Sequence, residues 1–270
     1  MKPSLRSTMP SKPQTTWAWA WMGACLGGLL ALGYWAPAHW LATAVSQASQ
    51  MQVTLLNPRG TVWDGTAQLA LTGGSGSSDT VALPGRVEWK IRPAWGVLRL
   101  SVLATCCTPD PLQLEVRANG LRAATLNLAD HQSTWPSSLL VGLGTPWNTL
   151  QLQGKLQLRT TGLSLDLAPD RTALAGRVQL DAIQVASRLS TIKPMGSYRL
   201  SVLGGNTPSL QLETLEGSLE LSGAGQWVNS RLRFDGIATA QADRIEALSN
   251  LLNIIGRRNG AQSVIQLGSR

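Results

Sequence analysis

Residues 150–159 read LQLQGKLQLR, and the alternation of leucine with polar side chains in this stretch decides the fold class. A period of two places the leucines on one face of an extended strand, in a core, and the polar residues on the other face, in water. The same pattern predicts strands in eight further segments: 87–92, 112–117, 163–167, 178–185, 198–202, 210–212, 219–221 and 232–235.

Clusters of Gly, Pro, Ser and Asn separate these segments and predict turns or loops. They lie at residues 73–79, 108–111, 135–138, 142–148 and 204–208. No helical pattern is interleaved with the strands, which favours an antiparallel all-β layer over a βαβ arrangement.

A short unit, Gly-x-(Val/Leu)-x-(Trp/Leu), recurs at Gly85, Gly154, Gly176 and Gly217. Glycine at the head of a strand permits a tight turn or bulge, so the unit predicts a curled sheet built from a repeated hairpin-like element. Coincidence in a glycine-rich β protein is the alternative. The pattern is compatible with a closed sheet, a sandwich or an open groove.

The N-terminal stretch 17–38, WAWAWMGACLGGLLALGYWAPA, belongs to a longer segment without Asp, Glu, Lys or Arg between Lys12 and Arg59. About 20 mostly apolar residues cross the ~30 Å hydrocarbon layer, so this stretch predicts a transmembrane signal anchor at 17–38. Lys2, Arg6 and Lys12 lie before it and no basic residue follows until Arg59, which predicts a cytoplasmic tail at 1–16 and an exported remainder. The alternative is a signal peptide cleaved after Ala36-Pro37-Ala38.

The fold class predicted for the whole chain is therefore mainly β, with an N-terminal transmembrane helix, a curled antiparallel β-sheet domain and a short C-terminal helix. Residues 39–52 predict a membrane-proximal helix or linker, and 53–270 a periplasmic β-rich domain. Within that domain, 243–258 has apolar residues on one helical face, and 263–267 predicts a final strand.

The formal net charge is +8, of which the tail contributes three charges. Because Lys and Arg alternate with apolar residues instead of clustering, we expect contact with acidic lipid head groups or acidic partners and no nucleic-acid binding. Cys25 lies in the anchor, while Cys106 and Cys107 are adjacent. A bond between neighbouring cysteines closes a strained ring, which predicts two thiols; a redox switch is the alternative.

Residues suited to catalysis are sparse. The exported region has one histidine, His131, which lies beside Asp130 in a predicted loop. We find no nucleophile elbow, no metal-binding spacing and no phosphate-binding loop. Most carboxylates, such as Glu88 and Glu220, occupy the polar phase of strands. The sequence therefore predicts no enzymatic activity, no cofactor, no metal and no small-molecule substrate.

Three stretches carry a resemblance to a known family: NPRGTVWDGTAQL (Asn57 to Leu69) after the anchor, LEGSLELSGAGQWVNSRLRFDGIATA (Leu215 to Ala240) and LSNLLNIIGRRNGAQSVIQLG (Leu248 to Gly268). In this order they resemble the type II secretion system protein N family, also called general secretion pathway protein N. Residues 72–212 share only the general strand pattern of the family and none of its quoted stretches.

The resemblance implies a single-pass component of the bacterial inner membrane that acts as a scaffold or assembly factor in export of folded proteins. Implied partners are other inner-membrane components of the apparatus, with the outer-membrane secretin as a further candidate. No catalytic residues come with the resemblance. Since Trp and Arg are enriched at interface hot spots, the candidate interface residues are Arg59, Trp63, Trp227 and Arg257. A place in the core is the alternative for both tryptophans.

A second hypothesis comes from another class of protein. Repeated amphipathic strands in an anchored periplasmic protein can form a groove that carries acyl chains, as in the AsmA-like family. A dry closed core would favour the scaffold, and a long open apolar groove would favour lipid handling.

Overall fold

The computed structural model describes residues 17–74, 76, 77, 79–120, 122–169, 171–228 and 231–268. They belong to two compact units, divided between residues 36 and 37. The predicted cytoplasmic tail, 1–16, lies outside the described residues.

The first unit contains one helix, α1 (Trp17–Tyr34), whose described large apolar side chains are all exposed. Among the described residues, no helix combines the length and the apolar character needed to cross a membrane. Helix α1 stops at Tyr34, and a second helix begins at Ala38. Pro37 between them disfavours helical backbone at the residue before it, which explains the break.

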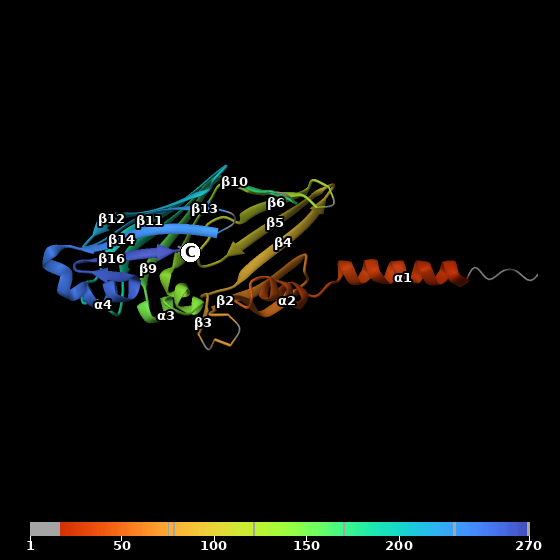
Figure 1. Cartoon of the computed structure of the whole chain (residues 1–270). Helices are drawn as coiled ribbons and strands as arrows, with labels where there is room; N and C mark the ends of the chain where they lie inside the picture. The colour runs from red at the N-terminus through yellow and green to blue at the C-terminus, as the bar shows by residue number, and fades with distance from the viewer. Residues whose placement is uncertain are drawn as a thin grey trace, which may run out of the picture. The chain divides into compact units, whose positions relative to one another are not determined.

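Within the described residues, sixteen antiparallel strands form one sheet in the second unit (Figure 1). Strands β1 to β8 are β1 (Val53–Gly60), β2 (Asp64–Thr72), β3 (Thr80–Ala82), β4 (Val87–Ala94), β5 (Val97–Ala104), β6 (Leu112–Ala118), β7 (Ala124–Leu128) and β8 (His131–Pro136). Strands β9 to β16 are β9 (Gln153–Ala168), β10 (Arg171–Ala186), β11 (Gly196–Gly205), β12 (Ser209–Gly217), β13 (Leu219–Val228), β14 (Arg231–Ala240), β15 (Arg257–Asn259) and β16 (Gln262–Leu267).

The strand order follows the chain closely: β1-β2-β4-β5-β6-β7-β9-β10-β11-β12-β13-β14-β16-β15, with β3 paired to β2 and β8 to β9. In the described part of the chain, β1 and β15 are not paired with each other, so the sheet stays open. The mainly β prediction is confirmed, and the open sheet answers the question of closure that the sequence pattern left undecided.

Glycine bulges bend the two longest strands. The register of β9 and β10 shifts between the pairs Ser164↔Ala175 and Thr161↔Arg177. Gly162 and Gly176 at this shift both have positive φ, and a Cβ on Gly176 would collide with the backbone of Gly162. The sequence segments 150–159 and 163–167 were predicted as two strands. They form mostly one strand, β9, because the bulge at Gly162 lets the chain continue instead of turning back.

The helices of the second unit pack on the sheet at separate places. They are α2 (Ala38–Ala48), the 3-10 helix η1 (Ser137–Leu143), α3 (Trp147–Leu150), the 3-10 helix η2 (Ala242–Arg244) and α4 (Ile245–Ile255). Each of α2, η1 and α4 supplies buried side chains to a different apolar cluster. The predicted C-terminal helix is confirmed as α4, and α2 occupies most of the segment 39–52.

Two of these clusters matter below. The N-terminal cluster consists of Ala38, Ala67, Trp89 and Ile91, with half-buried neighbours that include Trp63. The C-terminal cluster consists of Leu150, Val185, Met195, Tyr198, Leu219, Ala238, Ala240, Leu248, Leu251 and Leu252. Its α4 leucines are completely buried, at 0–1% exposure.

Several sequence predictions are corrected in the middle of the chain. The predicted loops at 135–138 and 142–148 contain parts of η1 and α3. Helices this short gain their stability from packing, here through buried Leu139 and Leu150, and leave no periodic signal in the sequence. His131 was predicted in a loop but begins β8, where it pairs with Thr160 of β9.

The adjacent cysteines also differ from the prediction, because Cys106 and Cys107 form a disulfide instead of two thiols. They lie on the turn after β5, whose backbone is held tightly. The Thr108 hydroxyl accepts a hydrogen bond from the Ala104 N–H (2.8 Å), and the Cys107 N–H donates to the Ala104 carbonyl (2.9 Å). This turn brings the two sulfur atoms together, with Cys106 exposed and Cys107 buried.

Polar side chains on β10 and β11 form an ion pair with two contacts. Arg199 donates from Nε to Asp181 Oδ1 (2.8 Å) and from Nη2 to Asp181 Oδ2 (2.9 Å). These hydrogen bonds hold the pKa of Asp181 below its usual value, although burial opposes them, and they raise the pKa of Arg199. Gln179 donates to the same carboxylate (3.0 Å). The pair therefore links β10 to β11 through side chains on the polar face of these strands.

Candidate interaction site

The turn between β1 and β2, from Gly60 to Gly65, is the part of the family-like signature GTVWDG that the structure shows in most detail. The Thr61 N–H donates to the Asp64 carbonyl (2.8 Å), and the Asp64 N–H donates to the Thr61 hydroxyl (3.1 Å). Gly60 has a φ of +87°, and a Cβ at this position would press on the Asp64 carbonyl. Glycine at the head of the turn is therefore required by both conformation and space.

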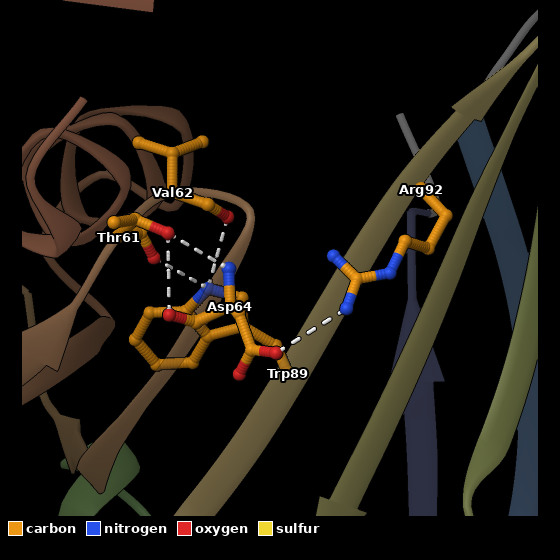
Figure 2. Close-up of polar contacts among 5 residues, drawn as sticks. All are labelled: Thr61, Val62, Asp64, Trp89 and Arg92. Carbon is orange, nitrogen blue, oxygen red and sulfur yellow. Dashed lines mark hydrogen bonds and ion pairs between the residues drawn. The ribbon is translucent and has the colours of Figure 1, made fainter. Parts of the chain in front are cut away.

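Trp89 of β4 fastens this turn to the sheet (Figure 2). Its indole Nε1 donates to the carbonyls of Val62 (3.0 Å) and Thr61 (3.3 Å), and its side chain is buried at 4% exposure. A Cβ at Gly65 would overlap the indole ring, so the second signature glycine leaves the space that the ring occupies. The turn is a rigid structure and not a loose connection.

Charged side chains cover the outside of the turn. Arg92 of β4 reaches Asp64 at 3.4 Å, and both side chains are more than half exposed (Figure 2). Arg59, at the end of β1, is exposed immediately before the turn. The surface therefore presents accessible charges on a rigid backbone, which suits recognition of a polar or charged protein partner.

Arg86 holds the same region by hydrogen bonds and was not among the residues predicted from the sequence. Its Nε donates to the Thr66 hydroxyl (2.9 Å), and its Nη2 donates to the carbonyls of Asn57 (2.9 Å) and Thr66 (3.0 Å). Asn57 has positive φ beside the register shift between β1 and β2. Arg86 thus ties the irregular end of β1 to β2, and the GRVEW repeat in which it lies was the available signal.

The four predicted interface residues fall into two separate groups. Arg59 and Trp63 both belong to the β1–β2 region, where Trp63 packs half-buried beside the N-terminal cluster and its carbonyl accepts from the Ile91 N–H (2.7 Å). Trp227 is half-buried on β13, and Arg257 is exposed on β15. β1 and β15 are opposite ends of the strand order. The structure therefore brings Arg59 and Trp63 together but does not join them to Trp227 and Arg257.

His131 and Asp130 have different partners despite their adjacency. The Asp130 carboxylate accepts a hydrogen bond from the Gly162 N–H (2.6 Å), while the His131 N–H donates to the Thr160 hydroxyl (3.1 Å). Both residues line a cavity of about 390 Å³ with Asp110 and Thr134. Over the described part of the chain, no group of three or more His, Cys, Asp or Glu side chains is placed to hold a metal ion.

An open antiparallel sheet with a rigid, charge-covered turn defines the chain as a β-sheet protein whose candidate site is a contact surface. The family model described as "Type II secretion system (T2SS), protein N" matches residues 51–266. The chain therefore belongs to the type II secretion system protein N family. No curated protein and no solved structure matches the chain.

The match covers β1 to β15 in full and β16 except its last residue, and it includes residues 72–212, where the sequence resemblance was weakest. It spans both the β1–β2 turn and the C-terminal cluster. Membership in this family implies that the protein is a component of type II secretion.

Proposed function

We propose that this protein is a scaffold or assembly factor of the type II secretion apparatus, held at the bacterial inner membrane with its β-sheet unit in the periplasm. The observation that carries the proposal is the family match over residues 51–266. The protein acts by contacts with other inner-membrane components of the apparatus and with the outer-membrane secretin. Its role in the export of folded proteins is non-catalytic and needs no cofactor.

Membrane attachment by the segment 17–38 is part of the proposal. The absence of charged residues between Lys12 and Arg59 and the exposed apolar side chains of α1 support it. A helix that exposes Trp and Leu on all sides is poorly suited to water and finds a better surrounding in lipid. The basic residues before this segment support a cytoplasmic N-terminus.

The β1–β2 turn is the proposed contact surface. It combines a rigid backbone with three exposed charged side chains, Arg59, Asp64 and Arg92. Rigid surfaces bind partners with a smaller loss of conformational entropy than flexible loops. The lipid-handling alternative receives no support from the family match.

Deletion and complementation in the bacterium that encodes the chain test the proposal. We expect deletion to leave a type II substrate in the periplasm and the full chain to restore its release into the medium. A deletion strain that secretes the substrate at the full rate would refute the assignment as a required component.

Fractionation tests the attachment separately. We expect the full chain to stay with the membrane pellet after alkaline extraction. A variant in which residues 1–38 are replaced by a cleavable signal peptide should be exported and recovered in the soluble periplasmic fraction. Release of the full chain into the supernatant by alkaline extraction would contradict membrane attachment by this segment.

A further inference from the structure

The turns of the sheet's hairpins gather at one end of its strands, which we call the tip end. The β1–β2 turn, the β4–β5 turn and the β6–β7 turn follow one another there, because Asp64 pairs with Lys90, Ala94 with Val97, and Val97 with Arg117. The register continues through Ala124↔Leu167 to the β9–β10 turn. The tip end is therefore a row of neighbouring turns, of which the first belongs to the signature motif.

The β4–β5 turn carries an unusual side chain for a soluble surface. Trp95 is fully exposed, at 103% relative to an open reference, and it lies at the extreme of a two-residue turn, Trp95–Gly96. Leu98 beside it is 37% exposed, and the rest of the turn is Pro93, Ala94 and Val97. Burial of an entire indole against another surface would be favourable, so Trp95 is a candidate contact residue.

Two arginines lie directly behind this apolar tip. Arg92 of β4 and Arg99 of β5 are cross-strand partners, and each side chain is 64% exposed. With a strand rise of about 3.3 Å per residue, both lie about 10–13 Å behind Trp95 along the hairpin. Their carboxylate partners, Asp64 (3.4 Å) and Glu115 (3.0 Å), form exposed ion pairs, which are weak in water and can exchange with other anions.

This spacing matches a bilayer surface better than it matches a protein groove. Indole rings prefer the level of the lipid head groups, and Arg side chains at the membrane surface are attracted to the anionic groups of the same layer. The hairpin has an indole at its turn and two guanidinium groups farther from the turn. This arrangement suits insertion of the indole into a bilayer surface and contact of the guanidinium groups with lipid phosphates.

The tip end is also where the chain enters the second unit. Pro37, the first residue of that unit, forms a bridge with Thr61 of the β1–β2 turn. Asp64 of the same turn pairs with Arg92, three residues before Trp95. A chain attached to a membrane through residues before Pro37 therefore enters the second unit at its tip end.

From these observations we propose that the β4–β5 hairpin inserts Trp95 into the head-group layer of the membrane, where Arg92 and Arg99 contact lipid phosphates. The hairpin is then a second membrane contact that orients the sheet. The inference rests on the proposed membrane attachment of segment 17–38.

Photo-crosslinking from single positions of the full chain in cells tests the inference. A photoreactive amino acid is placed at position 95, at position 30 in α1, or at position 191, which is exposed in the β10–β11 connection at the opposite end of the strands. We expect phospholipid adducts at positions 95 and 30 and none at 191.

The three positions separate failure of the inference from failure of the attachment. Lipid adducts at 30 with none at 95 would overturn the hairpin contact and leave the anchor standing. Protein adducts alone at 95 would overturn it in favour of a protein partner. Absence of lipid adducts at both 30 and 95 would overturn the attachment together with the inference.

A second measurement uses the purified full chain in vesicles of phosphatidylethanolamine and phosphatidylglycerol. With the photoreactive group at position 94, an exposed alanine at the end of β4, we expect a several-fold loss of lipid adducts in the Trp95→Ser background and retention in Trp95→Tyr, since tyrosine also prefers the interface. Equal adduct yields in the Trp95→Ser and unsubstituted chains would contradict the role of the indole.

Discussion

The N-terminal and C-terminal clusters of the sheet show two ways of ending an open sheet. The C-terminal cluster is covered by α4, whose leucines at 248, 251 and 252 are completely buried. The N-terminal cluster contains only four buried residues and is held to its turn by hydrogen bonds from the Trp89 indole. Burial therefore stabilises one end, whereas a rigid turn with exposed charges is displayed at the other.

The largest expected effect tests the C-terminal side of this comparison. Leu252→Ala removes a side chain with 0% exposure and should lower the free energy of unfolding by about 2–5 kcal/mol, through lost burial and a cavity. Chemical denaturation of the purified full chain in detergent measures it. Ile254→Ala on the same helix, where the side chain is 40% exposed, is the matched control and should cost much less. Similar losses in both variants would contradict the role assigned to α4.

The next effect tests how the N-terminal turn is held. Trp89→Phe removes the indole N–H and leaves the carbonyls of Thr61 and Val62 without this donor, which should cost about 1–3 kcal/mol. Hydrogen exchange at the amides of Thr61 and Asp64 should accelerate. Trp95→Phe makes the same chemical change at an exposed site and should leave both stability and exchange near their original values. Unchanged exchange in Trp89→Phe would show that the indole does not fasten the turn.

A smaller effect concerns the polar phase between the two clusters. Arg199→Gln should lower stability at pH 7 by about 1–2 kcal/mol, because Asp181 loses its charged donor. The pKa of Asp181 is lower in the folded chain than in the unfolded chain. Its contribution is therefore present above the unfolded pKa and is lost as the pH falls through the folded pKa.

The pH dependence gives this prediction its own check. The stability difference between the original chain and Arg199→Gln should be full at pH 7 and shrink as acid protonates Asp181 below the usual carboxylate range. Denaturation curves at several pH values measure it. A difference that stays constant down to strongly acidic pH would contradict the ion pair as its source.

The smallest effect is expected at the surface of the turn. Arg92→Gln breaks an exposed ion pair with Asp64 and should change the free energy of unfolding by less than about 0.5 kcal/mol. Calorimetric melting of the full chain measures it. A loss of more than about 1 kcal/mol would mean that the charges outside the turn are structural, and the contrast between the two clusters would weaken.

The sequence was sufficient for the strands with clear alternation, such as 87–92, because one face of β4 is buried and the other is exposed. It did not reveal β1, β2, β3, β5, β7, β8 or β15, whose short or mixed segments owe their strand structure to pairing with neighbours. The disulfide between Cys106 and Cys107 was missed for a similar reason. The prediction of two thiols rested on ring strain and did not include the turn around Ala104 and Thr108, which brings the two sulfur atoms together.

The candidate site was predicted in part. The signature motif pointed to Arg59 and Trp63, but the side chains that fix their surroundings, Arg86 and Trp89, come from beyond the motif and reach it only through the pairing of β2 with β4. Long-range pairing of this kind cannot be read from local alternation. Arg59, Trp227 and Arg257 were predicted as one set of interface residues because the strand order, which separates them, was not known from the sequence.

We propose that the β1–β2 turn displays a contact surface for the secretion apparatus. Arg59→Glu tests it most directly, because this side chain is exposed and its reversal should disturb a partner and leave the core intact. Arg233→Glu, an exposed arginine on β14, is the matched control. Release of a type II substrate in a complemented deletion strain should fall with Arg59→Glu and stay normal with Arg233→Glu, at equal protein levels and melting temperatures. A folded Arg59→Glu chain that supports secretion at the full rate would contradict the claim.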